Sequence, residues 1–319
     1  DDWSDATAVY FASALMPKSG VEKVTEKVLR IPRSVKIASL KRLPRHDRLR
    51  FDQTLIVGAT WYPTVAVHLY HTIPPGTPVP PTPQARRVLD PREVTYILSD
   101  IYFGKSGAVP LNKQDHIAFQ RAGGNPFYGE LKFEGAQMLF KELSLRESDV
   151  VVDLGSGIGK FVLQAHLATP AQKVVGVELA EARHKLALGA KKHLLFGEKG
   201  YIDPQPNRIL ELRHGDFLAS DFNPLDAQTD QPGSPQSIER SENFVGLSEA
   251  TVLYACSAHF PPKVVRGIVR KALQIPRGVT LVVFNELPKH KRLRKVKQLL
   301  VPTSWNDAVP LYIYRTVAP

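Results

Sequence analysis

The chain has 319 residues and a formal net charge of +11. That length leaves room for one large α/β domain and a smaller second domain. The sequence contains no run of about 18 apolar residues, so it predicts no membrane span. Its start lacks the basic and apolar segments of a signal peptide, and its one cysteine, Cys256, excludes an internal disulfide and gives no metal-ligand spacing. We therefore expect an intracellular protein with no metal site.

The positive charge is concentrated in two stretches. Residues 21–50 carry +7 and residues 289–297 carry +6, so the rest of the chain carries −2. Blocks of this kind attract polyanions. A solvated face, or a nuclear-import signal at residues 289–297, is the alternative. Because two such runs occur in one chain, we expect contact with nucleic acid or a nucleosome.

The N-terminal part of the chain predicts a small α+β module. Residues 13–30 have a helical pattern that Gly20 should interrupt, and residues 49–56 and 64–70 read as two strands. Six prolines within residues 73–83 predict an extended polyproline linker. We therefore place one module at residues 1–88 and the larger domain at residues 89–319.

The pattern that dominates the larger domain is VVVDLGSGIGK at residues 150–160. The valines before Asp153 predict a strand buried on both faces, and the glycines then allow a tight turn before an apolar helix. The next buried run ends at Glu178, whose carboxylate can accept both hydroxyls of a ribose. A strand, a glycine loop, a helix and this acid together indicate an adenosine cofactor.

The spacing of the glycines discriminates between such cofactors. A dinucleotide fingerprint is GxGxxG, whereas this loop is GxGxG and places Lys160 where the third glycine would stand. Asp153 would repel a pyrophosphate, but it suits a ligand with a cationic sulfonium and an ammonium group. We therefore expect S-adenosylmethionine. A glycine turn with a purely structural role is the alternative.

The remaining segments complete an alternating α/β pattern. After a helix beginning at residues 90–93 and a loop over residues 104–130, strands are expected at residues 208–213, 251–256, 279–285 and 311–317, with helices at residues 180–196 and 262–273. A polar insertion is expected at residues 223–250. Such alternation predicts a parallel sheet whose ligand lies at the carboxyl ends of the strands, near Asp153, Glu178, Asp216 and Cys256.

Five sequence blocks, in the same order and at similar spacing, resemble the histone-lysine methyltransferases of the disruptor-of-telomeric-silencing type. They are YGELKFEGAQM at residues 128–138, DLGSGIGK at 153–160, GVE at 176–178, GDFL at 215–218, and SW at 304–305 with Tyr312. The resemblance covers about residues 90 to 318, and within the family it suggests the compact kinetoplastid members. It implies a class I S-adenosylmethionine-dependent methyltransferase with a Rossmann-like seven-stranded sheet, nuclear location, and a core histone lysine in the nucleosome as acceptor.

The resemblance also implies roles for individual residues. Glu130 would hold the methionine end of the donor, Glu178 the ribose, and Asp216 with Phe217 the adenine. The full set expected to bind the donor is Glu130, Gln137, Asp153, Gly155, Ser156, Gly157, Gly159, Glu178, Asp216 and Phe217. Tyr312 would line the channel for the substrate lysine. Aromatic walls are expected from Tyr128, Phe260 and Tyr312, with Ser257 orienting the amine and Cys256 in a lining role.

Three positions depart from the family pattern. Leu131 stands where a small hydroxyl residue is usual, Lys160 where a glutamine is usual, and Cys256-Ser257-Ala258 where the family has an NNF segment. The last departure concerns the acceptor end of the site. RNA or small-molecule methylation by the same fold, and a non-catalytic donor-binding module, therefore stay open. No heptad run predicts a coiled-coil dimer, so a monomer is expected.

Overall fold

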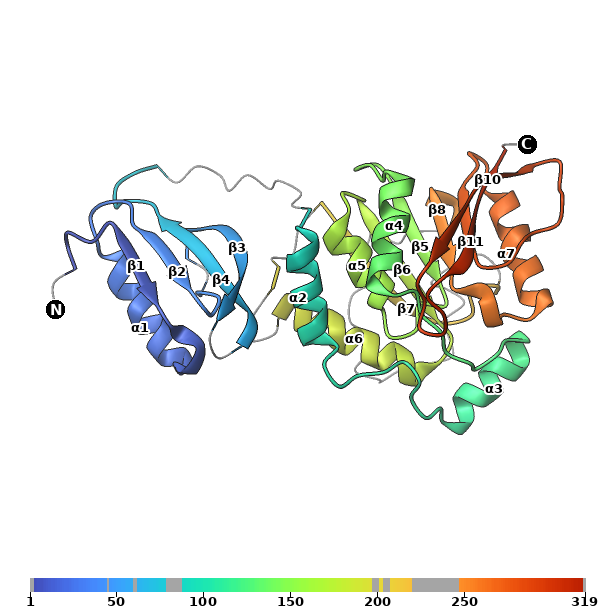
Figure 1. The fold of residues 1–319 in the computed structure, drawn as a ribbon, viewed down its shortest axis with the longest axis horizontal. Helices are drawn as coiled ribbons and strands as arrows, with labels where there is room; N and C mark the ends of the chain where they lie inside the picture. Colours follow the sequence, from blue (N-terminus) through green and yellow to red (C-terminus); the bar gives the residue numbers. More distant parts are fainter. Residues whose placement is uncertain are drawn as a thin grey trace, which may run out of the picture. The chain divides into compact units, whose positions relative to one another are not determined.

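The computed structural model describes residues 3–44, 46–59, 62–78, 88–196, 201–202, 207–219 and 247–317. Most of the expected insertion at residues 223–250, and the end of the proline-rich stretch, lie outside the described residues. The chain forms two compact units, Asp1–Ile101 with Lys192–Pro204, and Tyr102–Lys191 with Gln205–Pro319 (Figure 1). Each unit is described by itself.

The first unit is built on a four-stranded sheet with the order β1-β2-β4-β3. Its strands are β1 (Ala8–Phe11), β2 (Lys36–Ser39), β3 (Leu49–Ala59) and β4 (Tyr62–Thr72), and helix α1 (Lys18–Leu29) packs on one face. Gly20 falls in the first turn of α1, so it does not interrupt the helix as expected. Buried Val21, Val28, Ile37 and Tyr70 form much of the core.

Helix α2 (Pro91–Ile101) packs against β3 and therefore groups with the first unit. The sequence placed this helix in the larger domain, and the boundary expected at residue 88 stays a prediction. Helix α2 has the apolar face expected for it, with Val94, Ile97 and Ile101 buried. No helix among the described residues is long and apolar enough to cross a membrane.

The second unit contains a seven-stranded sheet with the order β10-β11-β9-β8-β5-β6-β7. Strands β5 to β9 are parallel, whereas β11 is antiparallel to both β9 and β10, so it runs opposite to the other six. The strands are β5 (Val150–Leu154), β6 (Lys173–Glu178), β7 (Ile209–His214), β8 (Val252–Ala255), β9 (Thr280–Val283), β10 (Leu293–Val301) and β11 (Val309–Thr316). This order is that of class I S-adenosylmethionine-dependent methyltransferases, and it confirms the predicted fold class.

Helices cover both faces of this sheet. Helix α7 (Pro262–Gln274) packs with Val152 and Leu154 in one apolar cluster, while α5 (Lys160–Ala168) lies over the other face beside α4 (Phe133–Leu143). Gly176 allows this second packing, because a Cβ there would lie 2.7 Å from Val162 of α5. A Cβ at Gly176 would also lie 2.8 Å from Ser156, so this glycine lets both α5 and the glycine loop approach β6 closely.

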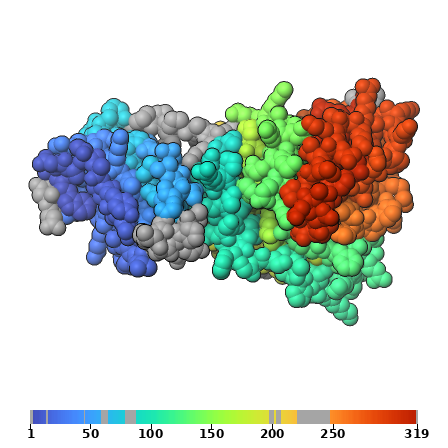
Figure 2. All heavy atoms as spheres, in the orientation of Figure 1, coloured from blue at the N-terminus to red at the C-terminus, as the bar shows by residue number. Residues whose placement is uncertain are grey.

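Two elements differ from the expectation. The stretch at residues 104–130 contains helix α3 (Lys113–Ala122), which begins at a capping box formed by Asn112 and Asp115 and ends at the left-handed Gly123. The basic run at residues 289–297 enters strand β10 at the edge of the sheet. The C-terminal strands form a continuous part of the visible surface of the second unit (red in Figure 2).

Candidate functional site

The glycine loop between β5 and α5 is fixed by its backbone. Gly155, Gly157 and Gly159 have φ values of 91°, 56° and 83°, which an L side chain rarely adopts. The N–H groups of Gly155 and Ser156 donate to the carbonyl of Val177 at 2.8 and 2.9 Å, so the loop is attached to the end of β6. Gly159 is the N-cap of α5.

Two aromatic rings close on this loop. A Cβ at Gly155 would lie 3.0 Å from the Phe260 ring, and a Cβ at Gly157 would lie 2.7 Å from the Tyr128 ring. Phe217 and Phe260 stack with ring centroids 6.0 Å apart. The loop therefore presents bare backbone to a narrow, aromatic space, as the approach of a flat ligand requires.

Two carboxyl groups are buried beneath the loop. Glu178 is 4% exposed and accepts N–H donors from Gly157 at 2.7 Å and Ala180 at 2.8 Å. Burial raises its pKa, although these two hydrogen bonds and the nearby charge of Arg183 oppose the rise. Asp153 is 2% exposed, and its Oδ1 has no hydrogen-bond partner among the described residues. Burial, and then the charge of Glu178, raise the pKa of Asp153 well above its usual range.

A pocket of about 740 Å³, including its open mouth, lies at the carboxyl ends of the strands. The expected site residues that line it are Tyr128, Gly155, Gly157, Glu178, Asp216, Phe217, Cys256 and Phe260. Asp216 accepts the N–H of Leu218 through Oδ1 at 2.8 Å, which orients its carboxylate. Burial, and then Asp153, raise the pKa of the Cys256 thiol to about 12, so the sulfur is neutral and serves as a lining group.

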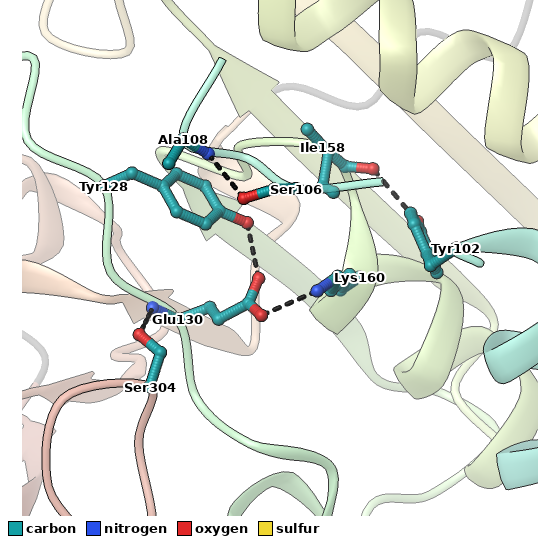
Figure 3. Close-up of polar contacts among 8 residues, drawn as sticks. All are labelled: Tyr102, Ser106, Ala108, Tyr128, Glu130, Ile158, Lys160 and Ser304. Carbon is teal, nitrogen blue, oxygen red and sulfur yellow. Dashed lines mark hydrogen bonds and ion pairs between the residues drawn. The ribbon is translucent and has the colours of Figure 1, made fainter. Parts of the chain in front are cut away.

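Glu130 lies next to this pocket in a set of polar contacts around the start of α5 (Figure 3). The Tyr128 hydroxyl donates to its Oε2 at 2.6 Å, and the Lys160 ammonium contacts its Oε1 at 2.6 Å. The backbone N–H of Glu130 donates to Ser304 Oγ at 3.1 Å, which joins the segment to the β10–β11 connection. Burial and Glu130 raise the pKa of Tyr128, so its hydroxyl keeps its proton.

Seven of the expected site residues, Glu130 among them, lie outside the pocket lining. Ser257 is fully buried, and its hydroxyl accepts the N–H of Phe284 at 3.0 Å. Tyr312 is half-buried on β11, with the Lys295 ammonium 4.6 Å from its ring centroid. Gln137 lies on α4, and its Nε2 is buried with no hydrogen-bond partner among the described residues. Asp153, Ser156 and Gly159 lie in or directly beneath the glycine loop.

Arg183 is a pocket residue that the sequence interpretation assigned only to a helix. It is 6% exposed on α6 (Glu181–Phe196), and its guanidinium donates to the carbonyls of Gly107 and Pro126. Its Cζ lies 5.1 Å from the ring centroid of Tyr128. Arginine within a basic helix looks like a surface residue in sequence, because only the tertiary fold brings the two carbonyls to it.

The sequence interpretation did not assign Phe127 or His259 to the site, although both lie in an aromatic group at the pocket. Phe127 and His259 line the pocket, with ring centroids 6.2 Å apart, and Trp305 lies 5.5 Å from His259. His259 directly follows Cys256-Ser257-Ala258, the segment that departs from the family's NNF pattern. Among the described residues, no group of three or more His, Cys, Asp or Glu could hold a metal ion.

The residues present fit S-adenosylmethionine. A buried carboxyl with an oxygen that lacks a partner can accept a cationic ligand, and the glycine loop leaves room that a Cβ would fill. Glu178 has accepting capacity left for ribose hydroxyls beyond its two backbone contacts. Asp216 and Phe217 stand where an adenine could be held from its edge and its face.

Comparison with solved structures finds methyltransferases at low similarity. One is an RNA methyltransferase from Salinibacter ruber in complex with S-adenosyl-L-homocysteine (18% identity, TM-score 0.35, 58% of this chain and 90% of that chain). Another is a putative RNA methyltransferase from Pyrococcus horikoshii (14% identity, TM-score 0.39, 73% of this chain and 100% of that chain). These TM-scores are too low to assign a fold, so the assignment of the class I methyltransferase fold depends on the strand order.

Sequence comparison is more specific. Residues 110–222 match the family described as "Histone methylation protein DOT1". A Drosophila melanogaster protein, "Histone-lysine N-methyltransferase, H3 lysine-79 specific", is 35% identical over 96 residues, which are 30% of this chain and 5% of that protein. The chain therefore spans only a small part of that relative's length. These matches confirm the resemblance predicted from the sequence blocks: residues 110–222, which match the DOT1 family, lie within a class I methyltransferase fold.

Proposed function

We propose that this protein is a histone-lysine N-methyltransferase that transfers a methyl group from S-adenosylmethionine to a core histone lysine in the nucleosome. The observation that carries the proposal is the buried Asp153 carboxyl, whose Oδ1 lacks a partner directly beneath a bare glycine loop within the DOT1-type segment. A cationic donor supplies the charge that this acid needs. The chromatin substrate is inferred from the family match and the curated relative.

The donor's role is limited to one contribution: when bound, it supplies a methyl group on a cationic sulfonium. The chain's own residues bind the donor and orient it toward the acceptor amine. Burial raises the pKa of Asp153 and of Glu178, and the positive charge of a bound donor would favour their ionised forms. Phe217 offers a ring face, and Asp216 offers an acceptor at the adenine end. Because methyl transfer to an amine is an in-line displacement, alignment contributes more than strong acid–base chemistry.

The acceptor must arrive as a neutral amine. A lysine ammonium has a pKa of about 10.4 in water, and an aromatic, poorly hydrated channel lowers that value. Phe127, Tyr128 and Phe260 supply aromatic walls at the pocket mouth, with His259 beside them. Cys256 is a neutral lining group there. Tyr312 and Ser257 stay proposed acceptor-side residues, although neither lines the pocket.

The nucleosome is the partner that the basic surface favours, and the protein would then act in the nucleus. Three of the six basic side chains in residues 289–297 already form ion pairs or hydrogen bonds within the fold. Lys295 pairs with Glu286 at 2.7 Å, Lys297 pairs with Glu142 at 2.6 Å, and Arg292 donates to the carbonyl of Leu273. Lys289, Lys291 and Arg294 are exposed and remain available to a polyanion. The monomer expected from the sequence stays a prediction.

The test is transfer of labelled methyl from S-adenosylmethionine to intact nucleosomes, free histone octamer and RNA in parallel, at two salt concentrations. Asp153→Asn keeps the shape of the side chain and removes its charge, so it should abolish labelling. Asp149→Asn, in the turn before the same strand, is the matched control. Salt-sensitive label on a histone lysine that Asp153→Asn removes is the expected result.

Other outcomes decide between the alternatives. Label on RNA alone would refute the histone substrate and leave a methyltransferase of another class. Donor binding without transfer to any of the three substrates would indicate a non-catalytic donor-binding module. Absence of donor binding would refute the proposal at its first step.

A further inference from the structure

We propose that the imidazole of His259 is the proton acceptor for the substrate lysine, and that it takes a proton from the lysine ammonium before the amine receives the methyl group. This inference rests on the proposed function, because it concerns how the same site prepares the acceptor. The resemblance assigns no role to His259, which lies just after the segment where the chain departs from the family pattern. The proposal therefore depends on where the fold places this side chain.

The turn that carries His259 is fixed beside the glycine loop. It is the 3-10 helix η4 (Ser257–His259), which follows β8, and β8 pairs in parallel with β5 at the centre of the sheet. The buried Ser257 hydroxyl accepts the N–H of Phe284 at 3.0 Å, which anchors the turn to the end of β9. Because a 3-10 helix has about three residues per turn, Cys256 and His259 share one face, and both line the pocket.

Two aromatic rings contact the imidazole on the side of the pocket that is open to solvent. The Phe127 ring centroid lies 6.2 Å from that of His259, and the Trp305 centroid lies 5.5 Å away in an edge-on arrangement. Phe127 is 74% exposed, and it lines the pocket together with the exposed His259. A lysine that enters from solvent can therefore reach the imidazole, and the imidazole can pass a proton on to water.

Three other titratable groups that line the pocket have no capacity to accept a proton from an ammonium. Burial raises the pKa of the Tyr128 hydroxyl and that of the Cys256 thiol, so both keep their own protons. The Arg183 guanidinium is a permanent cation. An imidazole, in contrast, ordinarily exchanges its proton near neutral pH, where a methyltransferase works.

The two carboxyl groups of the lining are engaged at the donor end. Glu178 accepts N–H donors from Gly157 and Ala180, and Asp216 accepts the N–H of Leu218. An ordinary carboxylate is also a weaker base than imidazole by about two pKa units. Among the described residues that line the pocket, the imidazole is therefore the base left for the acceptor.

The charged groups around the imidazole are mostly paired with one another. The rings of Phe127 and Trp305 carry no charge. In the segment that carries Phe127, the Glu130 carboxylate contacts Lys160 at 2.6 Å. The titratable groups of the surrounding elements are Cys256 in the same turn, Lys263 at the start of α7, Glu130, and Asp307, which pairs with Lys132 at 2.7 Å in the connection that carries Trp305.

The step moves one proton and leaves the methyl transfer unchanged. The lysine ammonium gives a proton to the neutral imidazole, and the amine then uses its lone pair to take the methyl group, which leaves a neutral sulfide. The imidazolium afterwards returns its proton to water. With an ordinary pKa of about 10.4, only about one lysine in a thousand is neutral near pH 7.5, so a base makes the abundant ammonium form usable.

The test compares kcat/KM for methyl transfer to nucleosomes at about pH 7, 8 and 9 in wild type, His259→Asn and His116→Asn. Asparagine keeps a planar polar side chain but takes up no proton. His116 is the matched control, because it is an exposed histidine on α3 that does not line the pocket. Each variant is divided by wild type at the same pH, so effects of pH on the nucleosome cancel. Calorimetric titration with S-adenosylmethionine and thermal unfolding show whether each variant binds the donor and is folded.

The expected result is a loss that depends on pH. His259→Asn should lower kcat/KM by about 100-fold near pH 7, since a positioned acid–base group contributes about 10²- to 10⁴-fold. This variant depends on lysine that is already neutral, and the neutral fraction rises about tenfold per pH unit. The deficit should therefore shrink to about tenfold near pH 8 and nearly vanish near pH 9. Donor affinity should change by less than about threefold, and His116→Asn should match wild type throughout.

Contrary results separate this inference from the proposed function. A deficit of His259→Asn that is equal at all three pH values would show that the ring only packs between its aromatic neighbours, and it would overturn the proposal. Activity of His259→Asn equal to that of wild type near pH 7 would also overturn it. Both outcomes leave the histone methyltransferase standing, whereas failure of wild type to methylate nucleosomes at any pH would overturn the proposed function and this inference with it.

Discussion

Arg183 should control the opening of one pocket wall. Its guanidinium donates from Nε to the Gly107 carbonyl at 3.1 Å and from Nη2 to the Pro126 carbonyl at 2.5 Å, so one side chain ties both ends of residues 107–126 to α6. The side chain is buried, and it faces the Tyr128 ring. We expect Arg183→Met to free this segment while the aliphatic part of the side chain still fills its space.

The size of the effect follows from the two hydrogen bonds. Each bond from a charged donor contributes about 1.5–3 kcal/mol, so their joint loss should cost about 3 kcal/mol or somewhat more. The segment can relieve this cost by opening to water, so the change should appear as local opening rather than global unfolding. At about 1.4 kcal/mol per factor of ten, amides within residues 107–126 should exchange their hydrogens about 100-fold faster.

Hydrogen exchange followed by mass spectrometry measures this directly. Lys185→Met on the same helix is the control, because the Lys185–Glu181 pair is exposed and should contribute less than about 1 kcal/mol. The reasoning would be refuted by unchanged exchange of residues 107–126 in Arg183→Met. That outcome would mean that α3 and its capping box hold the wall without the arginine.

Three further predictions concern stability and donor binding. Arg208, buried and donating to the carbonyls of His166, Thr169 and Ala171, should lose about 2–4 kcal/mol of unfolding free energy in Arg208→Met, measured by urea denaturation. Gly157→Ala should abolish donor binding, because φ is 56° and the Cβ would contact Tyr128 at 2.7 Å, whereas Gly189→Ala on α6 meets no atom within 4 Å and should stabilise by about 0.5–1 kcal/mol. The pKa of Asp153 is raised, so the folded protein keeps a proton there at pH values where the unfolded chain has lost it. The unfolding free energy should therefore fall as the pH rises from the ordinary carboxyl range through this raised pKa. Asp153→Asn should make the unfolding free energy, measured by urea denaturation, depend less on pH.

The cofactor end of the site was predictable because its signal is local. A run of valines, a glycine turn and an apolar helix specify strand β5, the loop and α5 within one short stretch, and the parallel sheet then brings Glu178 and Asp216 to the same edge. The GxGxG spacing, with Asp153 two residues before the first glycine, also indicated a cationic ligand. The structure adds that this acid is buried with an oxygen that lacks a partner.

Helix α3 was missed although its signals are present. Asn112 and Asp115 form a capping box, and Gly123 ends the helix in the left-handed region. The flanking glycines and prolines, and a helix of ten residues, made the whole stretch look like a loop. Only a search for paired start and stop signals would have found it.

The acceptor end was less predictable because it depends on side-chain direction. Ser257 directly follows Cys256, yet Cys256 lines the pocket while Ser257 turns inward and accepts the N–H of Phe284. A one-residue difference in a short 3-10 turn decides which side chain reaches the ligand, and sequence spacing cannot show it. His259 and Phe127 reach the mouth from segments more than a hundred residues apart.

The basic run at residues 289–297 shows how folding changes the meaning of a charge pattern. As a free tail it would offer six cations, but Lys295 and Lys297 of β10, and Arg292 just before it, make contacts within the second unit. If Lys289, Lys291 and Arg294 contact phosphates, binding should weaken about 40-fold between 50 and 200 mM salt, rather than the roughly 2,000-fold that six contacts would give. The combined change of these three residues to Gln should remove that part of the salt dependence on nucleosomes, measured by fluorescence anisotropy. A slope unchanged by the triple substitution would place the DNA contact elsewhere, with the N-terminal unit as the remaining basic surface.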